Sequence, residues 1–349
     1  MPNPHRQTTK VTWREPEQKT ALPSAVDLRC SCSVLPSPLR HVDAAPDTPA
    51  SARRPPLVLL HGHARRSLSH HHAPEGHVSI PRSPLRCPGG KSALAPLIGN
   101  LLHATDVSIV EPFAGSAAVS IALVTAGIID RAHIADADPG VAAFWHVLTT
   151  DHTPLVDWFA ATRPTVELFT YWQELDTTDQ QLLAQRTLFL SRTAWGAIPM
   201  AGPLGGWAQT DGAARITDRW NRQTTLARLG IIVELAHAGR LSAAPGPTSW
   251  QETLSTHPDG LAFIDPPYPG DGDRLYRHRF SEHAQLATAL RQRPGRSLIV
   301  YNDVPLIRGL YAWAPGLRTL DTRYSSITSS GSERSEVLID TSPPRTTMA

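Results

Sequence analysis

The sequence predicts an α/β protein with a doubly wound sheet and an inserted, mostly helical lobe. From about residue 85 onward, short apolar runs without polar alternation recur, as in strands that are buried on both faces of a sheet. Helical segments lie between these runs, and such alternation is typical of a doubly wound sheet. The stretch from about 150 to 225 interrupts the alternation with a helical pattern rich in Trp, Thr and Gln. We therefore expect this stretch to be an insertion into the sheet domain.

The individual elements follow from the same patterns. Strands are predicted at 107–110, 132–135, 231–235, 261–264, 297–301 and 336–339. Two clear helices are predicted at 116–127 and 281–293. The second helix has Ser281 as a favourable N-cap and ends before Pro294, which cannot continue a helix.

Residues 1–80 lack a sustained hydrophobic period and hold 11 of the 32 prolines and 8 of the 16 histidines. We expect a disordered tail without a metal site, because its His and Cys residues match no known ligand spacing. An alternative is that translation starts near Val78, which would remove the tail; the intact mass of the native protein tests this. The other predicted boundaries are 81–150 and 229–342 for the two halves of the sheet domain, 151–228 for the lobe and 343–349 for a second tail.

Charge and cysteine content limit the classes of protein. The net charge is only +2, so contact with nucleic acid requires a local basic patch rather than a basic domain. The three cysteines, Cys30, Cys32 and Cys87, cannot form a disulfide framework, which favours a reducing cytoplasm. No apolar run has the length of a membrane-spanning helix, and the N-terminus lacks the apolar core of a secretory signal.

The first segment with chemistry is a strand that runs into Glu111, Pro112 and Phe113 and then into small residues around Gly115. Such a turn allows a ligand to approach the backbone, and the helix after it offers free N–H groups. About 25 residues later the second strand ends at Asp136, where doubly wound folds bind a ribose. Taken alone, Asp136 fits an ordinary helix cap equally well. Together the two segments favour a nucleoside cofactor.

A second segment lies upstream of the first strand. Pro88, Gly89, Gly90 and Lys91 predict a tight turn that leads into a helix, with one cation at its mouth. The spacing is not that of a phosphate-binding P-loop, and a plain helix-start loop is an equal alternative.

The most specific segment is Asp-Pro-Pro-Tyr at 265–268, directly after a buried strand. Asp265 then lies at the carboxyl edge of the sheet, where ligands bind in such folds. Because proline fixes φ and donates no backbone hydrogen bond, we expect the Pro266 carbonyl to face outward as an acceptor beside Asp265. Two acceptors on a stiff loop match an amino group with two N–H donors, and Tyr268 offers a face for a flat ring. The competing interpretation is a proline-rich turn without function.

In this order the segments resemble the Dam-like class of adenine-N6 DNA methyltransferases, over roughly residues 85–340. CPGGK (87–91) is similar to the family's aromatic-Ala-Gly-Gly-Lys element, and EPFAGSAAV (111–119) to its FxGxG cofactor loop. The other matching stretches are ADAD (135–138), FLSRTAWG (189–196), IDPPY (264–268), YNDVPLIRGLY (301–311) and ERSEVLI (333–339). The last two resemble the family's closing strands. The order of motifs is that of the alpha group. The resemblance implies a Rossmann-like class I methyltransferase sheet with an inserted DNA-recognition lobe.

The resemblance also implies methyl transfer from S-adenosylmethionine to N6 of an adenine that is flipped out of duplex DNA, with no metal. Asp265 and the Pro266 carbonyl would hold the amino group, and Tyr268 would stack on the base. The implied cofactor-binding residues are Cys87, Lys91, Phe113, Gly115, Asp136 and Asp265. By the same resemblance we expect a cytoplasmic, nucleoid-associated monomer, while a cognate restriction enzyme as partner is left open.

The predicted DNA contacts are Arg192, Trp195, Arg277, Arg279 and Phe280. Arg192 and Trp195, with Trp207, interleave cations and aromatic rings in the lobe, which fits phosphate and base contacts. The spacing of Arg215, Arg219 and Arg222 predicts one face of a helix. Arg274, Arg277 and Arg279 follow the Asp-Pro-Pro-Tyr loop, where the phosphates of a flipped strand would pass, and Phe280 would wall the pocket.

Departures from the family pattern leave other interpretations open. Cys87 replaces a family Trp, Ala117 replaces a Gly and would add a methyl group beside the cofactor, and Ser191 and Gly196 replace Asn. A GATC target therefore cannot be carried over. Cys87 and Ala117 motivate the alternative of a regulator that binds DNA or cofactor but has lost catalysis. A third interpretation moves the substrate: cytosine-N4 enzymes more often carry Ser, and methylases of RNA or protein amides Asn, in place of Asp265, so the aspartate favours adenine.

Overall fold

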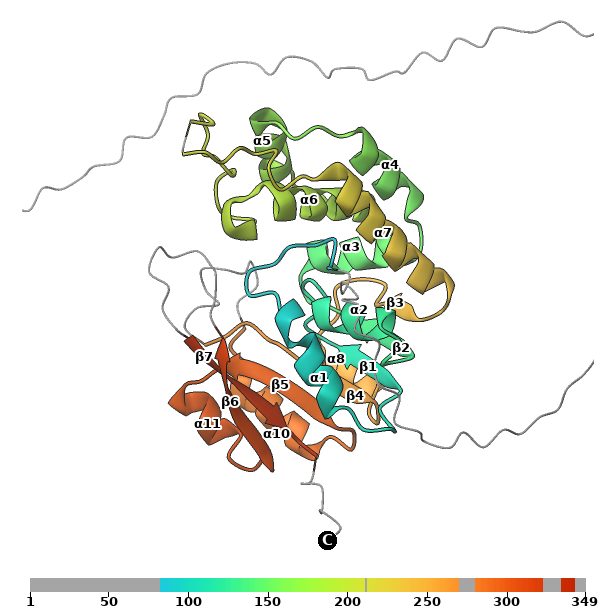
Figure 1. Cartoon of the computed structure of the whole chain (residues 1–349), viewed down its shortest axis with the longest axis vertical. Coiled ribbons are helices and arrows are strands. Elements are labelled where there is room, and N and C mark those ends of the chain that lie inside the picture. The colour runs from blue at the N-terminus through green and yellow to red at the C-terminus, as the bar shows by residue number, and fades with distance from the viewer. Residues whose placement is uncertain (1–81, 211, 270–279, 323–333, 343–349) are drawn as a thin grey trace, which may run out of the picture. The chain divides into compact units, whose positions relative to one another are not determined.

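The computed structural model describes residues 82–210, 212–269, 280–322 and 334–342 (Figure 1). The two predicted tails, the alternative start at Val78 and the cations Arg274, Arg277 and Arg279 lie outside these ranges. Within the described ranges, no helix combines the length and apolar character needed to cross a bilayer.

The described residues form a seven-stranded sheet in the order β3-β2-β1-β4-β5-β7-β6. Strands β1 to β5 run parallel, and β7 is antiparallel to both β5 and β6. The strands are β1 (Ser108–Glu111), β2 (Arg131–Ile134), β3 (Leu241–Ala243), β4 (Leu261–Ile264), β5 (Ser297–Asn302), β6 (Gly316–Thr322) and β7 (Arg334–Asp340). The predicted α/β doubly wound class is confirmed. The strand order reverses between β1 and β4, and ligands bind at such a switch point in open α/β sheets.

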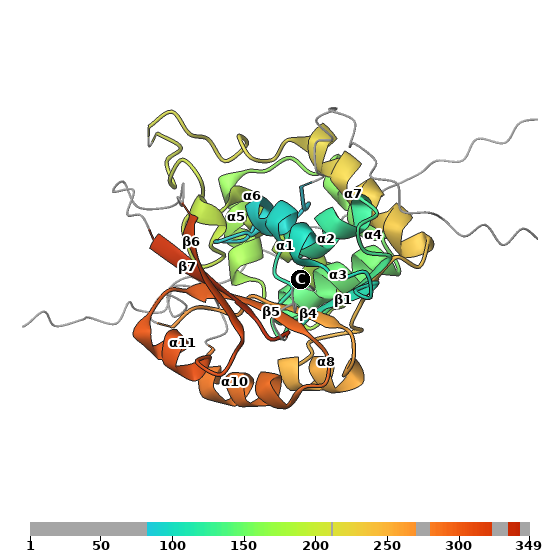
Figure 2. The same cartoon turned by 60° about the horizontal axis from the view of Figure 1, so that its bottom comes forward.

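Helices cover both faces of this sheet. Figure 2 shows α8, α10 and α11 on one face and α1, α2 and α3 on the other. The helices are η1 (Ser92–Leu94), α1 (Ala95–Leu101), α2 (Ala118–Thr125), α3 (Pro139–Thr149), α4 (Thr153–Ala161), α5 (Val166–Glu174), α6 (Gln180–Thr193), η2 (Trp195–Ala197), α7 (Arg222–His237), α8 (Trp250–Thr256), α10 (His283–Gln292) and α11 (Pro305–Leu310).

Two apolar cores result from this layering, and strands β1, β4, β5 and β7 contribute buried residues to both. In β4, Leu261 and Phe263 belong to the core under α1 to α7, whereas Ala262 and Ile264 belong to the core under α8, α10 and α11. This alternation follows from the pleat, because successive side chains of a strand point to opposite faces. All four side chains are buried, which explains why the sequence of this strand is apolar throughout.

Helices α4 to α7 form the lobe that the sequence predicts as an insertion, at the top of Figure 1. The lobe has no separate apolar core in the described residues: Leu188 and Phe189 of α6 belong to the same buried cluster as Phe144 of α3 and Phe263 of β4. The close contact is allowed by Gly140, because a Cβ at this position would overlap Thr187 Oγ1 of α6. The lobe and the sheet are therefore packed as one body through α3.

The predicted strand at 231–235 is wrong, because these residues lie in α7. Their apolar side chains continue a helical spacing, in which Leu229, Ile232 and Leu235 are buried at intervals of three. Asn221 starts the helix, since its side chain accepts a hydrogen bond from the Thr224 amide over 3.4 Å. The third strand instead begins at Leu241, and it is too short to produce a clear apolar run.

Three smaller expectations are also corrected. Arg215, Arg219 and Arg222 do not share a helical face, because α7 begins at Arg222 and the preceding residues form turns. The N-cap of α10 is Glu282 rather than Ser281. Residues 301–311 end β5 and form α11 rather than a closing strand, and β6, an edge strand with alternating polar residues, was not predicted.

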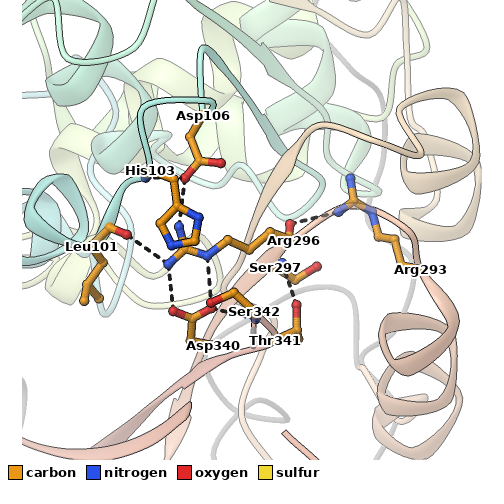
Figure 3. Close-up of polar contacts among 9 residues, drawn as sticks. All are labelled: Leu101, His103, Asp106, Arg293, Arg296, Ser297, Asp340, Thr341 and Ser342. Carbon is orange, nitrogen blue, oxygen red and sulfur yellow. Dashed lines mark hydrogen bonds and ion pairs between the residues drawn. The ribbon is translucent and has the colours of Figure 1, made fainter. Parts of the chain in front are cut away.

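The sheet edge at the amino ends of the parallel strands is fastened by Arg296 (Figure 3). Its guanidinium bonds Asp340 Oδ2 of β7 over 2.7 Å, Asp106 Oδ2 over 2.8 Å and the Leu101 carbonyl over 2.9 Å. Asp106 also accepts the His103 amide over 2.7 Å. The buried Arg296 guanidinium thus ties the segment between α1 and β1 to the last strand. The carboxyl ends of the parallel strands lie at the opposite edge of the sheet.

Candidate active site

Three carboxylates meet where the sheet order reverses. Glu111 ends β1, Asp136 lies two residues after β2, and Asp265 follows β4 directly. All three line one pocket of about 200 Å³ at the carboxyl edge of the sheet. Parallel pairing of β1 with both β2 and β4 brings these strand ends together.

The turn after β1 is closed by Asp136. The Gly115 amide donates a hydrogen bond to Asp136 Oδ2 over 2.8 Å, and the Asp138 amide donates to Asp136 Oδ1 over 2.9 Å. Trp145 Nε1 donates to the Gly115 carbonyl over 2.9 Å, and Gly115 itself has a φ of 45°, which favours glycine. Burial raises the pKa of Asp136 to about 7, although its backbone hydrogen bonds act in the opposite direction.

The helix-cap interpretation of Asp136 is wrong, because Asp138 is the N-cap of α3. Asp138 Oδ1 accepts the amides of Gly140 over 2.7 Å and Val141 over 3.1 Å. Asp136 therefore lies two positions before the cap, in the lining of the pocket.

Ala117 does not border the pocket as the sequence comparison suggested. It adopts the left-handed conformation with a φ of 46° and is fully buried in the core at the start of α2. Its neighbours Ser116 and Ala118 line the pocket instead. The methyl group of Ala117 therefore adds backbone strain and does not reduce the space for a ligand.

Lys91 joins the Gly-Gly-Lys turn to the Asp-Pro-Pro-Tyr loop. Its side chain is 8% exposed, and its ammonium lies 3.3 Å from Asp265 Oδ1 and 3.4 Å from Glu336 Oε1. It also donates to the Gly89 carbonyl over 2.7 Å and lies 4.9 Å from the centre of the Tyr268 ring. The predicted cation at the mouth of this turn is therefore placed against the loop after β4.

Within the described part of the Asp-Pro-Pro-Tyr loop, Asp265 and Pro267 line the pocket, whereas Pro266 is buried. Asp265 is 21% exposed. Burial raises its pKa to about 6; Lys91 lowers this value and Glu336 raises it. The Tyr268 hydroxyl donates to Glu336 Oε1 over 2.6 Å, so this ring is fixed beside the pocket rather than in its lining.

Aromatic and apolar groups form the other wall. Phe113 and Phe280 meet edge to face with their ring centres 5.2 Å apart, and both line the pocket. Cys87 lies in the same lining, and burial together with nearby carboxylates raises the pKa of its thiol to about 12. The thiol is thus protonated and acts as a small apolar surface.

Sequence reasoning missed the roles of Glu111 and Glu336. Glu111 is buried, accepts a hydrogen bond from the Ser120 hydroxyl, and has its pKa raised to about 8 by burial. Glu336 is buried in β7 beside Lys91 and Tyr268. A signal was present in both cases, because each glutamate adjoins a buried apolar run. Glu111 follows the run of β1, and Glu336 precedes the run at 337–339 in β7.

A larger, basic groove of about 750 Å³ adjoins the pocket, with which it shares the segment Leu85–Lys91. Its lining includes the five arginines Arg82, Arg86, Arg192, Arg219 and Arg228. Burial and the charges of Arg219, Arg228 and Arg82 lower the pKa of Arg86, which shows that these cations lie near one another. Trp195, 47% exposed, lines the same groove.

Arg192 has a different environment from the other groove arginines. It is only 3% exposed, and its guanidinium donates to the Pro84 carbonyl over 2.6 Å and 3.1 Å and to the Arg219 carbonyl over 3.4 Å. Burial lowers its pKa to about 9. This placement fastens the chain before the Gly-Gly-Lys turn to the lobe, rather than presenting a free cation to DNA.

Comparison with known families agrees with this geometry. The family model of the D12 class N6 adenine-specific DNA methyltransferases matches residues 88–324, which include the Gly-Gly-Lys turn, all three pocket carboxylates and the lobe. A search of curated proteins returned no match. Since the matched segment covers most of the chain and most of the pocket lining, the resemblance to adenine methyltransferases is confirmed, and the chain belongs to the D12 class of N6 adenine-specific DNA methyltransferases.

Proposed function

We propose that this pocket transfers a methyl group from S-adenosylmethionine to N6 of an adenine flipped out of duplex DNA. The observation that carries the proposal is the position of Asp265. It lies at the carboxyl end of β4 beside β1, partly exposed in a pocket whose opposite wall is the Gly115 turn. A carboxylate at this switch point is suited to hold an amine opposite a nucleoside cofactor.

The charges of the pocket support a cationic cofactor. Four acidic residues line it, Glu111, Asp136, Asp138 and Asp265, whereas the lysines and arginines in its lining, among the described residues, are Lys91 and Arg86. S-adenosylmethionine supplies an activated methyl group on a positively charged sulfur and also carries an ammonium group. Excess carboxylate around the pocket fits this charge better than it fits a phosphorylated cofactor.

Individual residues have complementary roles in this proposal. Asp136 would accept the ribose hydroxyls, because each of its oxygens keeps a lone pair beyond the bonds from Gly115 and Asp138. Phe113 and Phe280 would enclose the flat adenine ring of the cofactor or of the substrate. Lys91, Cys87 and the Gly115 turn would complete the cofactor side.

Asp265 would act on the substrate amine. Its carboxylate would accept an N–H of the exocyclic amine, together with the Pro266 carbonyl, and so favour positive charge on N6 as the new bond to carbon forms. The adenine would have to be flipped out, since a base inside the duplex cannot reach the pocket. Tyr268 would stack on the flipped base. The arrangement stabilises developing charge by fixed acceptors and needs no covalent intermediate.

The basic groove would hold DNA beside the pocket. Arg82, Arg86, Arg219 and Arg228 would neutralise phosphates, and Trp195 would contact a base or sugar. In this division, 81–150 is the cofactor half, 151–228 the recognition lobe and 229–342 the catalytic half. Arg277 and Arg279 keep their proposed phosphate contacts next to the catalytic loop.

The test is methylation of duplex DNA from radiolabelled S-adenosylmethionine, with the modified base identified by mass spectrometry. We expect N6-methyladenine from the wild type and none from Asp265→Ala, while the exposed Glu234→Gln control retains activity. A folded protein that binds the cofactor but methylates no DNA would support a regulator instead. N4-methylcytosine as product would keep the chemistry and overturn the substrate.

A further inference from the structure

Glu336 is a buried carboxylate directly before the apolar run of β7. It is 1% exposed and lies in β7 opposite Asn302 of β5 and Leu320 of β6. The three residues after it, 337 to 339, are buried and apolar. A buried charge costs several kcal/mol unless it is paired and hydrogen-bonded, so its partners decide why it is there.

Both described partners belong to the site. Glu336 Oε1 accepts the Tyr268 hydroxyl over 2.6 Å and lies 3.4 Å from the Lys91 ammonium. The same ammonium lies 3.3 Å from Asp265 Oδ1 and 4.9 Å from the centre of the Tyr268 ring. Three segments distant in sequence, the Gly-Gly-Lys turn, the loop after β4 and the last strand, therefore converge on one carboxylate.

We propose that Glu336 is a positioning residue: it holds the Tyr268 hydroxyl and shares the Lys91 charge, so that Asp265 keeps an oxygen available for the substrate amine. The inference rests on the proposed function for the identity of that amine. The contacts among the four side chains do not depend on it.

The physical reason is competition for one cation. Without the Glu336 charge, Asp265 is the one carboxylate of this network that still attracts Lys91, so the ammonium moves closer to it. The ammonium then occupies the Asp265 oxygen that the substrate amine needs as an acceptor. Without the hydroxyl contact, the Tyr268 ring loses the bond that fixes its plane beside Lys91. Glu336 also lines the basic groove, but in the proposal it acts on the reacting groups through these two side chains and not by direct contact.

Asp265 has further titratable neighbours, which any pH measurement must consider. Lys91, Glu336 and Tyr268 influence the pKa of Asp265. The charge of Asp265 in turn raises the pKa values of Glu111 of β1, Cys87 of the Gly-Gly-Lys turn and Tyr301 of β5. Glu336 acts in the direction that favours the protonated form of Asp265. Removal of the Glu336 charge should therefore lower the pKa of Asp265. A merely structural change would leave the pKa of Asp265 unchanged.

The experiment compares Glu336→Gln, Tyr268→Phe and their combination in the full chain, with Glu234→Gln as control. We expect Glu336→Gln to lower kcat about 10-fold, as for one lost charged contact, with the cofactor Kd changed less than about 3-fold. The acid limb of its kcat profile should move down by about 1 pH unit. Tyr268→Phe should also lower kcat but should move this limb upward, because the Tyr268 hydroxyl lowers the pKa of Asp265. The combined variant should lose less than the product of the two effects on kcat.

A second readout needs no turnover. The carboxyl carbon of Asp265, labelled with ¹³C and assigned by its loss in Asp265→Asn, is titrated by NMR in the wild type and in Glu336→Gln. A lower midpoint in the variant supports the inference even if no DNA is methylated, in which case only the proposed function fails. An unchanged midpoint and an unchanged acid limb in a folded Glu336→Gln protein overturn it.

Discussion

The Gly115 amide lies 2.8 Å from Asp136 Oδ2, so one hydrogen bond joins the loops after the first two strands across the floor of the pocket. Asp136 is thereby both a support of the Gly115 turn and a candidate ligand of the cofactor. Its raised pKa, about 7, and that of Asp265, about 6, mean that both carboxylates ionise near neutral pH.

We predict that S-adenosylmethionine binding releases protons at pH 6.5 and strengthens as pH rises from 5.5 to 8. A cationic ligand stabilises the ionised carboxylates and so lowers the pKa of Asp136 and Asp265 in the complex. Calorimetry in buffers with different ionisation enthalpies measures the proton release. Asp136→Asn should weaken binding about 10-fold or more, because it removes a charge and leaves one backbone N–H facing an amide donor. An affinity that does not vary with pH would contradict the prediction.

DNA affinity should depend on the arginines of the groove that are exposed or partly exposed, such as Arg86 and Arg228. Arg86→Gln and Arg228→Gln should each reduce the slope of log K against log salt by about 0.9 and weaken binding to all sequences alike. Fluorescence anisotropy at several salt concentrations measures the slope. Arg131→Gln, at an exposed position on β2, is the control and should leave the slope unchanged.

Arg192 should behave differently from its neighbours in the groove. Because its guanidinium is buried on the Pro84 carbonyl, Arg192→Leu should lower the free energy of unfolding by about 2 kcal/mol, since it leaves that carbonyl without its donor. The salt slope of the protein that remains folded should stay near the wild-type value. A reduced slope with unchanged stability would instead make Arg192 a phosphate contact.

The Arg296 cluster predicts a pH-dependent contribution to stability. Arg296→Leu leaves Asp340 and Asp106 buried without their cation and should cost about 3 kcal/mol at pH 7. Although burial acts to raise it, hydrogen bonds from Arg296 and Ser342 hold the pKa of Asp340 below its ordinary value. The stabilisation from the ionised Asp340 is therefore present above its ordinary pKa and lost as pH falls. The difference in free energy of unfolding between Arg296→Leu and the wild type should thus narrow below about pH 4.

Urea denaturation at pH 7 and at lower pH measures this difference. Arg308→Leu is the matched control, because its partner Asp303 lies in an exposed pair and Arg308 is 46% exposed. Such a pair contributes little in water, so the control should unfold close to the wild type at both pH values. An equal loss in both variants would contradict a special role of the buried cluster.

The contact between α3 and α6 should tolerate no side chain at Gly140. Gly140→Ala should cost about 2 kcal/mol, because its Cβ meets Thr187 Oγ1. Thr187→Ala in the same chain should recover most of this loss, and a double-mutant cycle by denaturation measures the coupling. Val141 and Thr187 line the pocket, so the single variant should also bind cofactor more weakly.

The sequence predicted the pocket better than it predicted the groove. Asp265, Asp136 and Lys91 each follow a recognisable local pattern, and the order of parallel strands brings them together. Arg86 and Arg228 lie far apart in the sequence, and only the packing of α7 against the segment before the Gly-Gly-Lys turn makes them neighbours. Pair contacts of this kind have no local signature. The same holds for the contacts of Glu336 with Lys91 and Tyr268, although the position of Glu336 beside an apolar run was visible.

Misassigned elements had a local cause as well. The run at 231–235 is apolar and β-branched, and it was taken for a strand because five residues are too few to separate a buried strand from a buried helix. Extending the window back to Asn221 shows the helical spacing and the cap. Arg192 was assigned to DNA from its charge, whereas the Pro84 carbonyl that binds it lies 108 positions away in the sequence.

Continuity of the core through α3 has a consequence for exchanging target specificity between enzymes. Phe144 and Trp145 belong to one buried cluster with Leu188 and Phe189 of the lobe and with strands of the sheet. A graft that replaced residues 151–228 alone would sever this cluster and expose apolar surface on both sides of the cut. A workable chimera would have to carry α3 with the lobe, so the natural module boundary lies near Asp138, immediately beside the cofactor pocket.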